Sequence, residues 1–311
     1  MKIVFFSSPA YAIPLLKKIL FLGHELSLVV TQGTNIKRRG KVVKTAVHEY
    51  CDKHNINYII SSLLDSDSIK KIKELNCDLG IIYAYGKMIP KEIIEIPKYK
   101  IMNLHCSLLP AYKGAAPIQH AILDDCYETG ITYFEINNKL DDGKILLQDT
   151  YKILETDNCA SVQDNLTNIA LTHLEEAIYL IQEKRFTNTI YKGHPSYANK
   201  IDKKYSEIDW DMNVRDIHNR VRALHQWPCV TVKINNTDIQ ILEAHIIEEK
   251  HDSRLGVISK FNKDVMYLAV KGGYLSIKSL RIPGKNIISN QDLYNSNSSL
   301  KNSIIKSLCD I

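Results

Sequence analysis

Short apolar runs alternate with amphipathic stretches over the first hundred residues, and this alternation constrains the fold more than any other feature of the chain. KIVFF at 2–6 is typical of a buried strand, residues 9–23 have apolar side chains at helical spacing, and LSLVVT at 26–31 is typical of a second strand. A strand, a helix and a strand within about thirty residues predict a βαβ unit and therefore an open parallel sheet. Further strands are expected at 57–60, 79–86 and 101–105.

The pattern changes in the second half of the chain. Two extended segments are expected on either side of the turn NKLDDG, followed by a long helix at about 159–184. After 206, short apolar runs recur with intervening turns, which favours a small β-barrel or sandwich. The sequence therefore predicts an α/β protein. A Rossmann-like open parallel sheet (1–188) is joined by a polar linker (189–206) to a small, OB-like β-barrel (207–311).

The sequence argues against several functional classes. The first strand-to-helix turn is SSPAYA and lacks the G-x-G-x-x-G fingerprint of nicotinamide and flavin enzymes. The seven cysteines are an odd number without a C-x-x-C pair, which argues against a disulfide framework or a zinc knuckle and favours a reducing, cytoplasmic setting. The N-terminal apolar run is too short for a signal peptide, and no apolar run is long enough to span a bilayer, so no membrane partner is expected.

Positive charge is unevenly distributed along the chain. Residues 1–188 contain 22 basic and 22 acidic residues, whereas residues 189–311 contain 18 and 13, so the net charge of +5 comes from the second part. A local basic cluster also follows the second predicted strand, and it comprises Lys37, Arg38, Arg39, Lys41 and Lys44. Such clusters often bind phosphates, although a solvated loop explains a lone cluster equally well.

A candidate site lies at 103–117, which reads NLHCSLLPAYKGAAP. Asn103 and His105 share one face at the carboxyl end of a predicted parallel strand, where open α/β sheets bind ligands. Asp141, in the turn LDDG, could supply a carboxylate, and the three groups together can stabilise an oxyanion and move a proton. Spacing alone leaves open whether Asp141 reaches His105, and whether His105 is only structural.

Other chemistries at this segment are less well supported. Cys106 should face away from His105, so a buried cysteine is favoured over a nucleophile. Ser107 lacks the G-x-S-x-G elbow of a serine hydrolase. The histidines and acids have no recognised metal-ligand spacing, so no metal is expected.

The segment NLHCSLLPAYKGAAPIQHAI, together with LDDGKIL, resembles the methionyl-tRNA formyltransferase family of folate-dependent formyltransferases. The resemblance covers nearly the whole chain and includes SSPAYAIPLL, TQGTNIKRRGK, AYGKMIP, IDW and NRVRALHQWP. The chain also departs from the family pattern. Cys106 replaces a usual glycine or alanine, Lys113 an arginine, Asp142 a threonine, and Ser7-Ser8 a Gly-Thr pair.

The resemblance implies the formyltransferase fold and direct attack of the methionyl-initiator-tRNA amine on the formyl carbon of 10-formyltetrahydrofolate, without a metal or a covalent enzyme intermediate. Asn103, His105 and Asp141 would be catalytic. The folate would contact Tyr85, Gly86, Met88, Ile89, Ser107, Leu108, Leu109 and Pro110, with the 137–143 loop closing over the pterin. The tRNA would contact Lys37, Arg38, Arg39, Lys41, Lys44, Arg215, Arg220 and Arg222, with residues 1–188 as the catalytic domain and 207–311 as the tRNA-binding domain.

A cytoplasmic monomer is expected. Two alternatives remain at this point. One is a formyltransferase that acts on another amine, such as a nucleotide sugar or glycinamide ribonucleotide. The other is a catalytically inactive relative that binds RNA.

Overall fold

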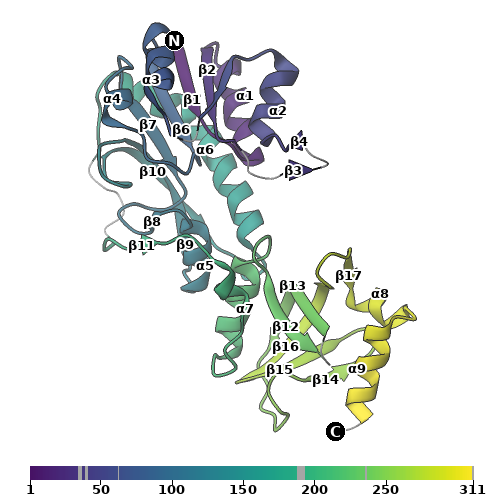
Figure 1. The fold of residues 1–311 in the computed structure, drawn as a ribbon. Coiled ribbons are helices and arrows are strands. Elements are labelled where there is room, and N and C mark those ends of the chain that lie inside the picture. The colour runs from purple at the N-terminus through teal and green to yellow at the C-terminus, as the bar shows by residue number, and fades with distance from the viewer. Residues whose placement is uncertain (34–36, 39–40, 62, 188–192, 235–236, 310–311) are drawn as a thin grey trace. The chain divides into compact units, whose positions relative to one another are not determined.

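The computed structural model describes residues 1–33, 37–38, 41–61, 63–187, 193–234 and 237–309 (Figure 1). The described chain forms two compact units. The first comprises Met1–Pro117, Glu128–Lys152 and Gln163–Asn199, and the second comprises Ile118–Tyr127, Ile153–Val162 and Lys200–Ile311. The second unit thus includes two short segments that precede residue 188, and the domain boundaries expected at 188 and 206 remain a prediction.

Seven strands form the sheet of the first unit, counted over the residues that the structure describes. In spatial order they are β10 (Lys144–Lys152), β9 (Glu128–Glu135), β7 (Ile101–His105), β6 (Leu79–Tyr83), β1 (Lys2–Phe6), β2 (Glu25–Thr31) and β5 (Tyr58–Ile60). The pairs from β7 to β5 are parallel, and the β9–β10 hairpin adds to β7 in antiparallel register. The expected open, mostly parallel sheet is therefore confirmed, and the hairpin begins where the sequence pattern changes.

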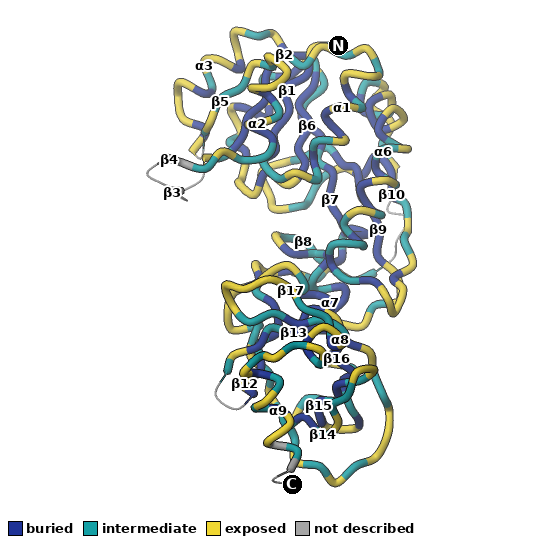
Figure 2. The backbone as a smooth tube through the Cα atoms, turned by 90° about the vertical axis from the view of Figure 1, so that its right-hand side faces the viewer, coloured by how far each residue is buried: buried dark blue, intermediate teal, exposed yellow. Residues whose placement is uncertain are grey.

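Helices cover both faces of this sheet, as Figure 1 shows. They are η1 (Ala10–Ala12), α1 (Ile13–Phe21), α2 (Ala46–His54), α3 (Ser66–Glu74), α4 (Lys91–Ile94) and α6 (Cys159–Gln182). Side chains of Thr45 and Asp65 cap α2 and α3 by accepting a backbone N–H from the first turn. Helices α3 and α4 pack on the sheet face that carries Val4 and Phe6. Figure 2 shows that β1, β6 and β7 are buried over most of their length, so the middle of the sheet forms the core.

The second unit is built on a curled antiparallel sheet, a half-barrel. Among its described residues the strands are β12 (Val230–Ile234), β13 (Thr237–Ile247), β16 (Gly273–Arg281), β15 (Met266–Val270), β14 (Ile258–Phe261) and β17 (Ile287–Ser289), which also pairs with β16. The helical segments of this unit are α5 (Pro117–Leu123), η2 (Lys203–Ser206), α7 (Val214–Ala223), α8 (Asn290–Asn295) and α9 (Ser299–Cys309). The small second β domain expected from the recurring apolar runs is thus confirmed.

The described residues of the first unit also include four very short strands. They are β3 (Lys37–Arg38), which pairs with β4 (Lys41–Val42), and β8 (Lys113–Gly114), which pairs with β11 (Tyr197–Ala198). Strand β8 belongs to the motif segment of the sequence, and its parallel pairing with β11 holds that segment in place.

Candidate active site

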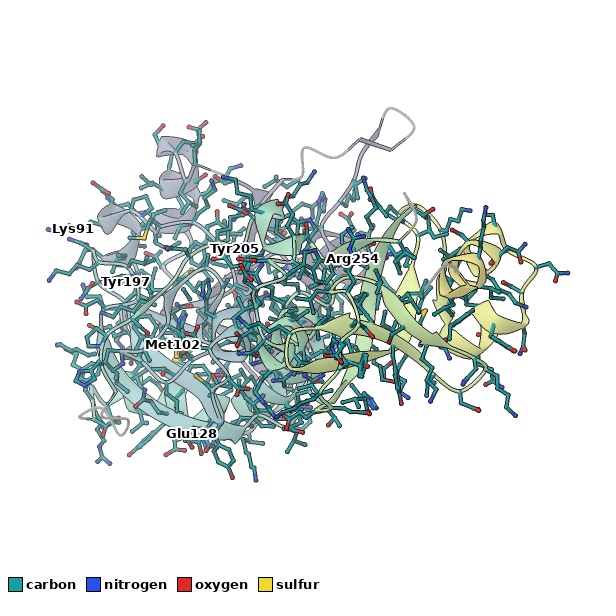
Figure 3. All side chains as sticks on the ribbon, turned by 90° about the horizontal axis from the view of Figure 1, so that it is seen from below. Lys91, Met102, Glu128, Tyr197, Tyr205 and Arg254 are labelled. Carbon is teal, nitrogen blue, oxygen red and sulfur yellow. The ribbon has the colours of Figure 1, made fainter. Side chains whose placement is uncertain are left out.

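Strand β7 positions the two central side chains of the site. Its apolar residues are buried, including Met102, which is labelled in Figure 3 and marks this strand among the side chains of the first unit. Asn103 pairs in register with Ile82 of β6 and His105 with Thr132 of β9. Because side chains two apart on a strand share a face, Asn103 and His105 lie together at the carboxyl end of β7.

The His105 ring is fixed by two oxygen atoms. Its Nε2 lies 2.8 Å from the carbonyl oxygen of Tyr112. A carbonyl can only accept, so Nε2 carries a proton and donates it. Its Nδ1 faces Asp141, with 3.8 Å to Oδ2, and the side chains of His105 and Asp141 are only 7% and 11% exposed. The two groups that the sequence could not bring together are therefore neighbours in the folded chain.

Close backbone approach fixes the position of Asp141. Its Oδ2 accepts the backbone N–H of Gly114 at 2.7 Å. Gly114 has φ of 121°, and a Cβ there would lie 2.7 Å from the carbonyl oxygen of Ala198. A Cβ on Gly143 would lie 1.9 Å from the carbonyl oxygen of Glu135. The glycines of G-A-A-P and L-D-D-G are thus required because no side chain fits where these backbones meet.

The S-L-L-P turn owes its shape to buried hydrogen bonds. The Ser107 hydroxyl is fully buried and donates to the carbonyl oxygen of Ala111 at 2.7 Å. Leu108 and Leu109 are buried as well. Leu109 packs against Phe134 and Ile145, so buried side chains anchor the turn in the protein.

Two residues that the sequence analysis missed support this turn. Thr132 of β9 donates its hydroxyl to the carbonyl oxygen of Ser107 at 2.7 Å and accepts the Leu109 N–H at 3.1 Å. Gln148 of β10 donates from Nε2 to the carbonyl oxygen of Leu109 at 2.8 Å and to the Thr132 hydroxyl at 2.9 Å. Both are polar residues at inward-facing positions of mostly apolar strands. A buried polar side chain needs a hydrogen-bond partner, and this requirement is the signal that could have identified them.

Cys106 is packed away from the site. Its Sγ lies 3.9 Å from the Tyr83 hydroxyl and 3.7 Å from the Gln163 amide nitrogen. Burial raises the pKa of the Cys106 thiol to about 11, so the thiol is protonated at neutral pH. A protonated, buried thiol is a poor nucleophile, in agreement with the interpretation of Cys106 as a packing residue.

The second candidate folate segment contains both buried and exposed residues. Tyr85 is buried edge-on against Phe6, and its hydroxyl donates to the carbonyl oxygen of Ser61 at 2.6 Å. Ile89 is buried in the core, whereas Met88 is 54% exposed. Tyr85 and Ile89 therefore support this segment from within, and Met88 presents its side chain to solvent.

The basic cluster after β2 is only partly described. Arg39 lies outside the described residues, and the same holds for the side chains of Lys37, Arg38 and Lys41. The ammonium group of Lys44 forms an ion pair with Asp52, whose carboxylate also accepts the Tyr58 hydroxyl at 2.8 Å. Lys44 is thus held by the body of the first unit.

The three arginines expected to bind tRNA in the second unit differ in their surroundings. Arg215 is partly exposed and pairs with Glu155 at 3.2 Å. Arg220 donates to the backbone carbonyl oxygens at 205 and 207, each at 3.0 Å. Arg222 is buried, and its guanidinium donates to the Leu154 carbonyl at 3.0 Å and to Asn219 Oδ1 at 2.6 Å. Arg222 is thus engaged inside the second unit, and its contact with tRNA remains a prediction.

Within the described ranges, no group of three or more His, Cys, Asp or Glu side chains could hold a metal ion. None of the helices in the part of the chain that the structure describes is long and apolar enough to cross a membrane.

Comparisons with known proteins identify the family of the chain. Residues 1–178 match the family model "Formyl transferase", and residues 200–298 match "Formyl transferase, C-terminal domain". The chain is 34% identical over 288 residues to the methionyl-tRNA formyltransferase of Clostridioides difficile (strain 630), which covers 92% of this chain and 93% of the relative. It is also 34% identical over 298 residues to the methionyl-tRNA formyltransferase of Sulfurihydrogenibium sp. (strain YO3AOP1), covering 94% and 96%.

Solved structures share the fold. The methionyl-tRNA formyltransferase from Clostridium thermocellum has a TM-score of 0.55 at 18% identity, over 80% of this chain and 95% of that one. The sugar 3N-formyl transferase WlaRD, solved in the presence of dTdp and 5-N-Formyl-THF, has a TM-score of 0.65 at 20% identity, over 92% and 99%. HypX from Aquifex aeolicus in complex with tetrahydrofolic acid has a TM-score of 0.63 at 16% identity, over 93% and 46%.

Proposed function

The chain belongs to the methionyl-tRNA formyltransferase family, and from this premise we propose how its own residues carry out the reaction of that family. The enzyme transfers the formyl group of 10-formyltetrahydrofolate to the α-amino group of methionyl-initiator-tRNA, which supplies the formylated tRNA for translation initiation. The observation that carries the proposed mechanism is the approach of Asp141 Oδ2 to His105 Nδ1 at the carboxyl end of β7.

The reaction needs one oxyanion site and one path for a proton. The amine attacks the formyl carbon, a C–N bond forms, and the carbonyl oxygen becomes an oxyanion. When the tetrahedral intermediate collapses, the bond to N10 of the folate breaks. The amine has then lost one proton and N10 has gained one, so the net proton transfer runs from the amine to N10.

His105 suits the role of oxyanion donor. Its Nε2–H is used by the Tyr112 carbonyl, so the proton for the substrate must come from Nδ1. When the ring also carries a proton on Nδ1, the 3.8 Å to Asp141 Oδ2 is too long for a hydrogen bond, so that N–H is available to the formyl oxygen. The nearby carboxylate stabilises the ring when both nitrogens carry protons. Asn103, on the same face of β7, is the second proposed donor to the oxyanion.

Asp141 suits the role of proton acceptor. One lone pair of its carboxylate accepts the Gly114 N–H, and a carboxylate has about four acceptor sites in all. A free site can take the proton of the attacking amine, directly or through a water molecule, and return it to N10. We propose that these steps use no metal ion and form no covalent bond to the enzyme.

The two substrates would contact different groups of residues. The backbone of the S-L-L-P turn, Met88 and the 137–143 loop would contact the folate, because these loops leave the same edge of the sheet as His105. The basic cluster, which follows β2 in the sequence, would contact tRNA phosphates, together with exposed cations of the second unit. We further propose that residues 1–188 form the catalytic domain and 207–311 the tRNA-binding domain of a cytoplasmic monomer.

A competition assay tests the acceptor. Labelled 10-formyltetrahydrofolate is incubated with the enzyme and with methionyl-initiator-tRNA, a dTDP-linked amino sugar or glycinamide ribonucleotide, and His105→Ala serves as the blank. We expect label only in methionyl-tRNA. Preferential label in either small amine would point to the alternative formyltransferase, and no label in any acceptor would point to an inactive relative.

A further inference from the structure

Two charged side chains beside the proposed catalytic groups, Lys113 and Asp142, meet in the structure. Lys113 and Asp142 are 29 residues apart in sequence, yet Lys113 Nζ lies 2.6 Å from Asp142 Oδ1. Asp142 directly follows Asp141, and Lys113 lies between Tyr112 and Gly114. Lys113 therefore adjoins both backbone groups that contact the catalytic side chains, the Tyr112 carbonyl at His105 and the Gly114 N–H at Asp141.

The segment 112–114 is a fixed support. On one side it is held by Ser196, which directly precedes β11, through Tyr112 N–H to Ser196 Oγ at 2.9 Å and Lys113 N–H to the carbonyl oxygen of Ser196 at 2.9 Å. Tyr197, labelled in Figure 3, belongs to the same strand β11. On the other side the segment contacts the catalytic groups, through the Tyr112 carbonyl to His105 and the Gly114 N–H to Asp141.

The turn at 141–142 docks on this support through two adjacent contacts. The first is the Gly114–Asp141 hydrogen bond, and the second is the Lys113–Asp142 ion pair. The Lys113 side chain is only 11% exposed, while Asp142 is 45% exposed. A nearly buried ammonium group needs a partner, so the Lys113 side chain favours the docked turn. The hydrogen bond from Lys113 also lowers the pKa of Asp142, which keeps that carboxylate charged.

We propose that the Lys113–Asp142 ion pair is a positioning latch, which holds the 141–142 turn so that Asp141 stays opposite His105 during formyl transfer. This inference rests on the catalytic roles proposed for His105 and Asp141. Neither Lys113 nor Asp142 is assigned a contact with the reacting atoms. They act through Asp141, whose carboxylate must keep its place relative to Nδ1 for the proton path to work.

Lys113→Met and Asp142→Ala test the latch. Because small misplacements of a catalytic group lower the rate strongly, each change should lower kcat about tenfold, with the KM values for folate and tRNA changed by less than about threefold. The double variant should be no slower than the slower single variant, because both changes open the same contact. Lys113→Arg should retain more of kcat than Lys113→Met, because a guanidinium can still pair with Asp142.

A matched control separates positioning from stability. Lys100 and Glu95 form an exposed ion pair in the same unit, so Glu95→Ala should leave kcat unchanged. The folded fraction of each variant is measured by circular dichroism, and kcat is expressed per folded molecule. Should Asp142→Ala fold poorly, the Lys113→Met and Lys113→Arg pair decides the matter, because methionine keeps the apolar stem of the lysine side chain.

The result that would refute the positioning role of the ion pair differs from the result that would refute the proposed function. The latch is wrong if Lys113→Met and Asp142→Ala keep kcat within about twofold of the wild type while His105→Ala is inactive, or if their effects on kcat simply add. A wild-type enzyme that cannot formylate methionyl-tRNA would instead refute the proposed function.

Discussion

Cys106 follows His105 in the chain but is buried against Tyr83 and Gln163 behind β7. Because its thiol has a pKa of about 11, the thiolate is rare at neutral pH. Cys106→Ala should keep most of the turnover with methionyl-tRNA, and the wild-type thiol should react slowly with iodoacetamide in the folded enzyme. A more than roughly tenfold loss of kcat in Cys106→Ala would show that the thiol takes part in catalysis.

His218 is a buried histidine that should make the second unit sensitive to acid. Its Nε2 donates to the carbonyl oxygen of Ala244 at 2.9 Å, and burial, with the nearby Arg222 charge, lowers its pKa to about 4. The unfolded chain binds this proton near pH 6.5, so the stability from neutral His218 is present above that pH. This contribution to the free energy of unfolding is lost as the pH falls toward about 4, and it amounts to about 3 kcal/mol in total.

Urea unfolding at about pH 7.5 and about pH 5 tests this histidine, and His218→Gln should lose less stability between the two conditions than the wild type. Both tryptophans, Trp210 and Trp227, belong to the second unit, so their fluorescence reports its unfolding. An equal loss of stability in wild type and variant would contradict the assignment.

At the scale of elements, the hairpin of β9 and β10 shapes the S-L-L-P turn through Thr132 and Gln148. Thr132→Val keeps the shape of the side chain but removes the hydroxyl, which leaves buried groups at Ser107 and Leu109 without this partner. We expect a loss of about 1–3 kcal/mol in unfolding free energy and a higher KM for the folate. Thr150→Val, at an exposed position of β10, is the control, and similar behaviour of the two variants would refute the role of Thr132.

At the scale of the whole molecule, the enzyme must hold a long polyanion while it acts at a small site. Arg39→Ala should lower kcat/KM for methionyl-tRNA and leave folate affinity unchanged, because the basic cluster follows β2 in the sequence and the parallel strands β2 and β7 end at the same edge of the sheet. The slope of log kcat/KM against log salt should become shallower by about one unit or slightly less. Lys70→Ala, an exposed lysine of α3, is the control, and an Arg39 variant that behaves like it would remove the cluster from tRNA binding.

The sequence predicts the two sheets because apolar period and turn residues are local properties. It also predicts the placement of Asn103 and His105, since a strand end has a known direction. It does not predict the contacts that depend on how distant segments meet. The partners of Thr132 and Gln148 follow from the register of β9 and β10, and the Lys113–Asp142 pair follows from the docking of one turn on another segment. The burial of Arg222 was missed for the same reason, since an arginine on an amphipathic helix has no local mark of burial.

The most direct measurement concerns His105 and Asp141, which are proposed to act together on the transferred formyl group. The rate of formyl transfer is measured at saturating 10-formyltetrahydrofolate and methionyl-tRNA for the wild type, His105→Ala, Asp141→Ala and the double variant. Each single change should lower the rate about a hundredfold or more, and the double variant should be little slower than either, because the two groups serve one step. A rate close to that of the wild type in either folded single variant would contradict the proposed mechanism.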